Sequence, residues 1–288
     1  MRILVLTGAG VSAESGIPTF RGKDGYWRNV DPTKLATPEA FACDPELVWE
    51  WYRERQQRIR SARPNAAHEA VARLAEHANE FLLVTQNVDD LHTRGGIPAE
   101  KMVQIHGNIF VTRCSRCEWR TQRRDDADWW AEFSDAGKND VRDQNGLAGA
   151  RPTSEAYEQP VGYGVRKHVR AFKAVPQSRD RRVPRCPECD ALLRPGVVWF
   201  GEQLPSDEVA RVENFLNGGA CEVVIVAGTT ATFGYVIDWA VRASQDGELI
   251  EVNPEETALS GFATRLVREA AAIALPRIVN RLVRSEKT

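Results

Sequence analysis

The sequence has no long apolar run and almost no net charge, and both absences exclude classes of function. No stretch approaches the roughly 20 apolar residues of a membrane-spanning helix, and Gly8 and Gly10 interrupt the apolar start before it reaches the length of a secretory signal. The formal net charge is only −2, which argues against a dedicated nucleic-acid-binding protein. We therefore expect a soluble, cytoplasmic protein without membrane partners or direct nucleic-acid binding.

Cysteine is also scarce, with 6 residues in 288, and its distribution does not suit a disulfide framework. Cys43 and Cys221 are isolated, as in proteins of a reducing compartment. The other four form two Cys-x-x-Cys pairs: Cys114, Cys117, Cys186 and Cys189. Each pair places two thiolates on one turn, and two such turns supply the four ligands of a tetrahedral Zn²⁺. A four-thiolate site has no open position, so we expect one structural zinc ion per chain and catalysis elsewhere.

Strand and helix patterns alternate along the chain. Residues 2–7 are typical of a buried parallel strand, followed by a Gly-x-Gly-x-x-Ala turn at 8–13, and further apolar runs occur at 81–85, 222–227 and 249–252. Helical patterns cover 45–60, 66–77, 207–216 and 235–244. This alternation predicts an α/β fold with a doubly wound parallel sheet. A length of 288 residues, 42% of them hydrophobic, allows one large Rossmann-like domain with an inserted small zinc-binding module and a helical segment.

The two cysteine pairs are separated by 68 residues (118–185), of which 25 are charged. The simpler interpretation is a solvated and partly disordered loop. However, residues 166–185 carry eight Lys or Arg against the single Asp180. The alternative is that this basic part contacts a partner or an acidic surface.

Polar, ligand-type residues follow several of the predicted strands. The glycine turn after residue 7 is typical of phosphate binding, although such turns also serve ordinary connections. Residues 12–22 are too polar for a normal crossover helix, so we expect a loop over the ligand with Arg21 near the phosphates. Gly228-Thr229-Thr230 and Asn253 follow two later strands and offer N–H, hydroxyl and amide groups to a nucleotide.

The segment from Gln86 to His92 places amides and carboxylates at the end of the 81–85 strand, where open α/β sheets bind ligands. The alternative is that Asn87 or Asp89 only caps the next helix, and His92 is expected to be structural. His106 precedes Gly107 close to the first cysteine pair, which would fix its position. It is either an ordinary loop histidine or a general base.

These motifs together resemble the sirtuins, NAD-dependent protein-lysine deacylases. The resemblance is carried by residues 8–21, 85–92, 106–108 and 195–202 and by the two cysteine pairs. It implies that His106 is the general base and that Asn87 is also catalytic. It also implies three groups of ligand-binding residues. The NAD loop is Gly8, Ala9, Gly10, Ala13, Glu14, Thr19, Phe20, Arg21 and Trp27; the ribose and nicotinamide are held by Gln86, Asn87, Val88 and Asp89; the adenosine end is held by Gly228, Thr229, Thr230, Asn253 and Ala271.

The same resemblance concerns the acylated substrate. Val197, Val198, Phe200, Gly201 and Glu202 would pair with the peptide backbone, and Ala36, Tyr52 and Arg55 look like the pocket of class III sirtuins that remove succinyl and malonyl groups. Tyr52 and Arg55 are i, i+3 neighbours on one helix face, so a hydroxyl and a guanidinium can jointly bind a carboxylate. The alternative is that Arg55 is one of several solvated arginines.

The implied reaction consumes NAD. The acyl oxygen attacks C1′ of the nicotinamide ribose, His106 assists the 2′-hydroxyl, and free lysine, nicotinamide and 2′-O-acyl-ADP-ribose are released. Two alternatives remain open: an NAD hydrolase or ADP-ribosyltransferase on the same fold, and a non-catalytic NAD-sensing zinc interaction module. We expect a single catalytic unit over 1–288. Its Rossmann-like part would comprise 1–21, 64–105 and 197–288, and its small domain the helical segment 22–63 and the zinc module 106–196.

Overall fold

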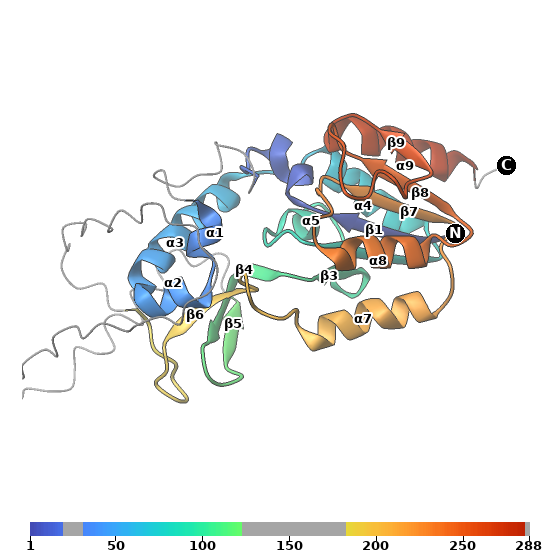
Figure 1. Cartoon of the computed structure of the whole chain (residues 1–288). Helices are drawn as coiled ribbons and strands as arrows, with labels where there is room; N and C mark the ends of the chain where they lie inside the picture. Colours follow the sequence, from blue (N-terminus) through green and yellow to red (C-terminus); the bar gives the residue numbers. More distant parts are fainter. Residues whose placement is uncertain (20–30, 123–182, 286–288) are drawn as a thin grey trace, which may run out of the picture.

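The computed structural model describes residues 1–19, 31–122 and 183–285. In Figure 1 a parallel sheet with helices on both sides lies next to a smaller part built from helices and a short antiparallel sheet. Phe20, Arg21 and Trp27, expected in the NAD loop, lie outside the described residues, as does most of the charged interval between the cysteine pairs.

The large sheet has six parallel strands in the order β3-β2-β1-β7-β8-β9. The strands are β1 (Arg2–Thr7), β2 (Glu80–Thr85), β3 (Met102–Gln104), β7 (Val223–Ala227), β8 (Glu248–Val252) and β9 (Arg265–Val267). The chain extends the sheet from β1 toward β3 and later from β7 toward β9. The order therefore reverses between β1 and β7, which is where open α/β sheets bind ligands. The predicted doubly wound fold is confirmed.

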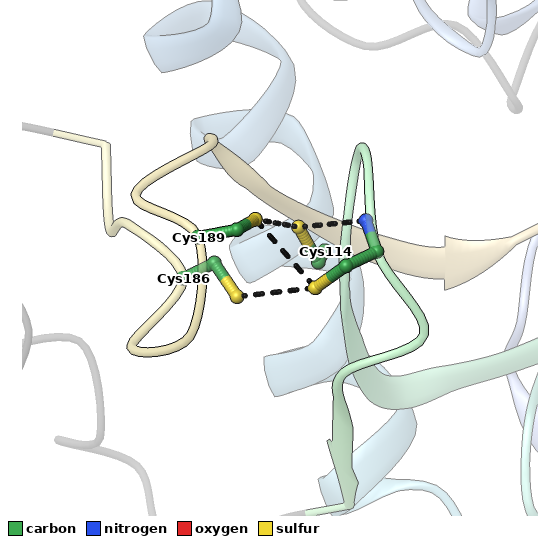
Figure 2. Close-up of side chains that lie close together, drawn as sticks. Cys114, Cys186 and Cys189 are labelled. Atoms are coloured by element: carbon green, nitrogen blue, oxygen red, sulfur yellow. Dashed lines mark hydrogen bonds between the residues drawn. The ribbon is translucent and has the colours of Figure 1, made fainter.

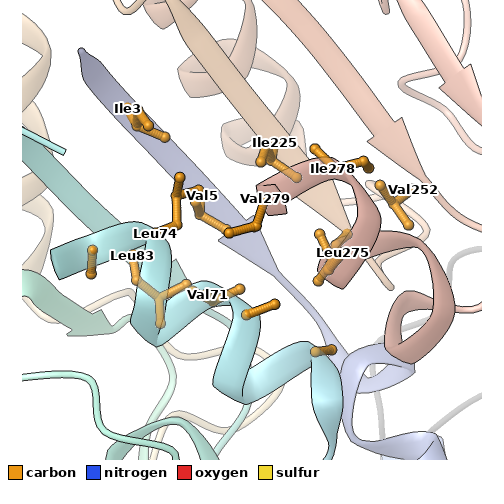
Figure 3. Close-up of a cluster of buried hydrophobic side chains, with 14 of the residues drawn as sticks. Ile3, Val5, Val71, Leu74, Leu83, Ile225, Val252, Leu275, Ile278 and Val279 are labelled. Carbon is orange, nitrogen blue, oxygen red and sulfur yellow. The ribbon is translucent and has the colours of Figure 1, made fainter. Parts of the chain in front are cut away.

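Helices cover both faces of this sheet. Helices α4 (Ala66–His77) and α9 (Ala271–Ser285) pack against one face, where Val71, Leu74, Leu275 and Val279 meet side chains of the strands (Figure 3). Helices α7 (Ser206–Asn217) and α8 (Gly234–Ala243) supply apolar side chains to the cluster on the opposite face. Both faces of the strands are thus buried, which explains their continuous apolar sequences.

The smaller part combines three helices with the sheet β5-β4-β6. The helices are α1 (Pro32–Leu35), α2 (Pro38–Cys43) and α3 (Pro45–Ser61), and the strands are β4 (Gly107–Cys114), β5 (Arg120–Gln122) and β6 (Leu193–Val197). Each helix has proline in its first turn and a side-chain cap from Asp31, Thr37 or Asp44. Trp49 is fully buried and donates its indole N–H to the carbonyl of Leu193, 2.9 Å away, which ties α3 to β6.

The expectation that the charged interval 118–185 is a solvated and partly disordered loop needs correction at its two ends, which belong to the small sheet and to its apolar core. Strand β5 lies inside the interval and pairs with β4 through the register Thr112↔Thr121. At the other end Val183 is buried in the apolar cluster formed by α1, α2, α3 and the small sheet. Within the described residues, no helix is both long enough and apolar enough to cross a membrane.

Candidate functional site

The glycine turn after β1 packs directly on the turn after β7. Gly8 donates its N–H to the carbonyl of Ala227 (3.0 Å) and Gly10 to that of Gly228 (2.8 Å). A Cβ at Gly10 would lie 2.8 Å from the Cα of Gly228, so a side chain does not fit there. The chain then forms only a short 3-10 helix, η1 (Ala9–Ser15), which ends at Gly16 with φ 81°. As predicted, the described residues 9–19 form no long crossover helix, and the turn lies at the switch point of the sheet.

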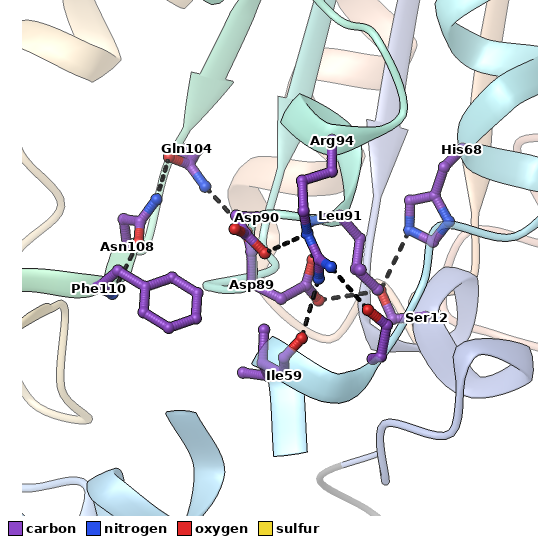
Figure 4. A network of polar contacts seen from close by, with 11 residues as sticks. Ser12, Ile59, His68, Asp89, Asp90, Leu91, Arg94, Gln104, Asn108 and Phe110 are labelled. Carbon is purple, nitrogen blue, oxygen red and sulfur yellow. Dashed lines mark hydrogen bonds and ion pairs between the residues drawn. The ribbon is translucent and has the colours of Figure 1, made fainter. Parts of the chain in front are cut away.

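Ser12 connects the glycine turn to the polar segment after β2. Its hydroxyl donates to the carboxylate of Asp89 at 2.9 Å and accepts from the amide of Asn87 at 3.1 Å. His68 lies 3.4 Å from the same hydroxyl (Figure 4). Because the His68 Nδ1 accepts the N–H of Asn65, its Nε2 carries the proton that faces Ser12. Burial lowers the pKa of His68 to about 4, so the imidazole is neutral near pH 7.

The carboxylates after β2 have different partners. Burial raises the pKa of Asp89, while its bonds to the Leu91 N–H and to Ser12 act in the opposite direction. Asp90 pairs with Arg94 at 2.9 Å, and Arg94 also donates to carbonyls at the end of α3 (Figure 4). Helix α5 (Leu91–Arg94) begins after Asp90, so the alternative that Asn87 or Asp89 is its N-cap residue is wrong, although Asp89 does accept the Leu91 N–H. Asn87 contacts Ser12, and Asp89 uses one carboxylate oxygen for Ser12 and the other for the Leu91 N–H.

His92 is structural, as expected. It is 2% exposed, and its Nε2 lies 3.1 Å from the hydroxyl of Thr7 at the end of β1. Its ring meets that of His68 at a centroid distance of 4.8 Å. Burial lowers the pKa of His92 well below the ordinary value, so this side chain is neutral and packs under the site.

His106 is half-buried between β3 and β4 and is held at both ring nitrogens. Its Nδ1 lies 3.1 Å from the carbonyl of Gln86 and its Nε2 lies 2.8 Å from the hydroxyl of Tyr235. The carbonyl only accepts, so Nδ1 carries the proton of the neutral ring and Nε2 is the basic nitrogen. Burial lowers the pKa of His106 below 6.5, and the bond to Gln86 opposes this shift. The imidazole is thus in its neutral, basic form at neutral pH.

The residues predicted for the adenosine end cluster after β7 and β8. Thr229 donates its hydroxyl to the side-chain oxygen of Gln86 at 2.6 Å, which links this cluster to the His106 region. Asn253 donates to the backbone carbonyl of Thr229 at 3.0 Å. Ala271 is buried at the start of α9, whereas Thr230 is exposed. Four strand ends therefore converge on one edge, as the sequence predicts.

The side chains predicted to bind an acyl group lie in the smaller part. Tyr52 is 1% exposed, and its hydroxyl accepts the indole N–H of Trp199 at 2.9 Å. Burial raises the pKa of Tyr52 to about 12. Arg55 is half-buried, with its guanidinium stacked over the Trp51 ring at 4.8 Å. Burial lowers the pKa of Arg55, while the charges of Tyr52 and Asp89 act in the opposite direction. Arg55 is therefore not an ordinary solvated arginine.

The segment from Val197 to Glu202 runs between His106 and the acyl-binding candidates. Val198 donates its N–H to the carbonyl of His106 and Phe200 donates to that of Ala36, both at 2.9 Å. The Glu202 carboxylate accepts from Arg194 at 2.9 Å and from the Trp199 N–H at 2.8 Å. These bonds fix the bend of the segment, and the Glu202 side chain is used inside the protein. Ala36 is also buried, next to the segment.

The four cysteines of the two pairs converge as predicted. Their Sγ atoms all lie within 4.8 Å of one another, and three pairs of sulfurs are 3.4, 3.5 and 3.6 Å apart. Figure 2 shows Cys186 and Cys189, from the turn before β6, facing Cys114 at the end of β4. Four thiolates around Zn²⁺ at about 2.3 Å would lie about 3.8 Å apart, so the geometry suits a structural zinc ion that joins β4 to β6.

Comparisons with known proteins identify the family. The family model for the Sir2 family matches residues 8–146 and 162–233. The chain belongs to the Sir2 family. It is 37% identical over 283 residues to an NAD-dependent protein deacylase of Aquifex aeolicus, covering 98% of this chain and 95% of that protein. It is also 37% identical to NAD-dependent protein deacylase 1 of Archaeoglobus fulgidus, covering 96% and 91% of the two chains.

Solved structures of the Sir2 family have the same fold. A Sir2 homologue in complex with NAD superposes with a TM-score of 0.74 at 36% identity and covers 100% of this chain and 91% of its own. A Sir2 homologue variant in complex with 2′-O-acetyl ADP ribose has a TM-score of 0.74 at 35% identity, with coverages of 99% and 92%.

Some residues of this Sir2 site are absent from the sequence-based set. Ser12 and His68 lie under the glycine turn, Arg94 holds the acidic segment to α3, and Tyr235 contacts His106. Ser12 lies inside the predicted NAD loop, where its spacing from Gly10 is a usable signal. For Tyr235 the sequence signals only a helix start, because its contact with His106 depends on how α8 packs.

Proposed function

We propose that this chain is an NAD-dependent protein deacylase that transfers an acyl group from lysine side chains to the ADP-ribose part of NAD. One water molecule is consumed, and the products are free lysine, nicotinamide and 2′-O-acyl-ADP-ribose. The names of the relatives and the NAD and 2′-O-acetyl ADP ribose complexes of Sir2 homologues support this reaction. The four-cysteine cluster supports a structural role for zinc, outside the chemistry.

The observation that carries the proposal is the state of His106. Gln86 holds its Nδ1–H, and burial favours the neutral ring, so Nε2 is the basic nitrogen of the ring. Bound NAD supplies an electrophilic ribose C1′ for the acyl oxygen, with nicotinamide as the leaving group. His106 then accepts a proton from a ribose hydroxyl at Nε2.

Other residues of the chain position the reactants. Asn87, Asp89 and Gln86 sit at the carboxyl end of β2 beside the glycine turn, where they are suited to bind the ribose and the nicotinamide amide. Asn87 meets the glycine turn through Ser12, so we assign it a catalytic role beside His106. The rest of the proposed binding site for this part of NAD consists of Val88 and the loop residues Gly8, Ala9, Gly10, Ala13, Glu14 and Thr19. Phe20, Arg21 and Trp27 are added to it from the sequence alone. Gly228, Thr229, Thr230, Asn253 and Ala271 would hold the adenosine end.

We propose that the acyl pocket prefers acidic acyl groups. Tyr52 uses its oxygen to accept from Trp199, so its hydroxyl proton is left for a carboxylate of the substrate. Arg55 keeps a guanidinium close by, on the same face of α3. A succinyl or malonyl carboxylate would meet both groups, while Ala36 limits the bulk of the pocket wall. Val197, Val198, Phe200, Gly201 and Glu202 form the proposed segment for the substrate peptide.

Several finer expectations stay predictions. They are a cytoplasmic location, the absence of direct nucleic-acid binding, the division into a Rossmann-like part and a small domain at the stated boundaries, and a partner contact through residues 166–185. Of this last segment, only residues 183–185 lie within the described ranges.

The test is loss of the acyl group from acetyl-lysine and succinyl-lysine peptides with and without NAD. We expect deacylation only with NAD. Because burial disfavours the imidazolium form of His106, the acid limb of the pH profile should lie below pH 6.5. NAD cleavage without peptide deacylation would instead favour an NAD hydrolase or ADP-ribosyltransferase. NAD binding without any turnover would favour a non-catalytic sensing module.

A further inference from the structure

Tyr235 is positioned to control the basic nitrogen of His106. It lies in the first turn of α8, with its hydroxyl 2.8 Å from the His106 Nε2. Its ring packs on Trp239 at 4.8 Å and stacks with Phe233 at 5.9 Å. Phe233 meets the imidazole edge-on at 5.7 Å. The base therefore faces an aromatic group from α8 that is not itself among the residues predicted to hold NAD.

The direction of each hydrogen bond around Tyr235 follows from donor and acceptor chemistry. The His106 Nδ1 must donate to the carbonyl of Gln86, so Nε2 is an acceptor and the tyrosine O–H donates to it. The Gln86 side-chain amide donates to the tyrosine oxygen at 3.0 Å. Thr229 donates to the oxygen of the same amide at 2.6 Å, which fixes the amide orientation. The result is one continuous chain of donors from Thr229 to His106.

This arrangement leaves the base occupied. A neutral imidazole has one lone pair in the plane of its ring, and Tyr235 uses it. The tyrosine oxygen is itself engaged by Gln86, and its remaining electron density is delocalised into the phenol ring, so it is a poor second acceptor. A proton from a substrate hydroxyl thus reaches His106 only after the tyrosine hydroxyl has moved away.

We propose that Tyr235 is a positioning residue that holds the His106 imidazole before NAD binds and then yields Nε2 to the ribose hydroxyl. The proposal rests on the assignment of His106 as the general base. Within the part of the chain that the structure describes, the groups in contact with the His106 ring are uncharged: Tyr235 and Phe233 from the α8 side and the backbone of Gln86 from the end of β2. A change at Tyr235 therefore acts on the base without altering a neighbouring charge.

The test compares the Tyr235→Phe variant with wild type in two pH profiles, because kcat/KM for NAD reports the NAD-free enzyme and kcat reports the complex. The tyrosine hydroxyl donates only to the neutral imidazole, so its removal raises the pKa of His106 in the NAD-free enzyme. We expect the acid limb of kcat/KM to move up by about one pH unit. The acid limb of the pH profile of kcat should not move. Because the tyrosine hydroxyl no longer competes with the ribose hydroxyl for Nε2, NAD should bind about threefold to tenfold more tightly.

Controls separate this effect from damage to the fold. The phenylalanine ring keeps the packing on Trp239, and thermal unfolding checks that the variant is folded. Ser244→Ala removes a hydroxyl from the other end of α8, which among the described residues bonds only to the Val241 carbonyl, and should leave both limbs in place. Direct NMR titration of His106, identified with the His106→Asn variant, should show the raised pKa only without NAD.

Two outcomes would overturn the proposal that Tyr235 yields the His106 Nε2 to the ribose hydroxyl. If both limbs move equally, Tyr235 stays on Nε2 in the complex. If neither limb moves and NAD affinity is unchanged, the hydroxyl does not influence the base. Failure of the underlying assignment looks different, because the His106→Asn variant would then keep its deacylase activity whatever Tyr235 does.

Discussion

Replacement of His106 by asparagine is expected to lower kcat for deacylation by about 10²–10⁴-fold, the usual contribution of a general base. Asparagine still offers an N–H to the Gln86 carbonyl but has no basic nitrogen in place of Nε2. The residues proposed to hold NAD are unchanged, so NAD affinity should stay close to that of wild type. The measurement is steady-state deacylation of an acyl-lysine peptide together with calorimetric titration of NAD.

His77→Asn is the matched control. His77 is also bonded to a backbone carbonyl, that of Arg73 at 2.8 Å, but it is exposed at the end of α4. Its replacement should leave kcat unchanged. Near-normal deacylation by the His106→Asn variant would show that the base is another residue.

The second large effect is expected from Arg55→Met. Methionine keeps an unbranched apolar side chain beside Trp51 but loses the guanidinium. Removing the partner of a buried carboxylate costs about 2–5 kcal/mol, so kcat/KM for a succinyl-lysine peptide should fall by roughly 30-fold or more. Turnover of the matched acetyl-lysine peptide should change little, because an acetyl group has no carboxylate to bind.

Arg58→Met provides the comparison on the same helix. Arg58 is exposed on α3, so its loss changes the charge of the helix without removing a group from the proposed pocket. The Arg58→Met substitution should leave kcat/KM unchanged for both the succinyl-lysine and the acetyl-lysine peptide. Equal losses for the two peptides in the Arg55→Met variant would contradict an acid-selective pocket and indicate a general structural role for Arg55.

The position of the site was predictable because parallel strands end at a common edge. Apolar runs locate β1, β2, β7 and β8, and the polar residues after them must then meet. The cysteine spacing likewise predicts the convergence of two distant turns. These inferences need only periodicity and spacing, which short sequence windows contain.

Other features depend on packing that such windows do not contain. Strand β9 has three residues, and α9 has Pro276 in its interior, so neither has a strong periodic signal. The Glu202 side chain turns to Arg194, an ion pair that the order of residues in the chain does not reveal. Tyr235 and His106 are 129 residues apart in sequence, and they meet because the first turn of α8 packs over the end of β2.

The most direct test of the proposed reaction is the stoichiometry of its products. A single mixture of enzyme, NAD and acyl-lysine peptide would be followed for nicotinamide, free-lysine peptide and O-acyl-ADP-ribose by chromatography and mass spectrometry. The proposal predicts equal amounts of all three throughout the time course. Nicotinamide in excess over free-lysine peptide, or an acyl group released as the free acid from the outset, would contradict acyl transfer to ADP-ribose.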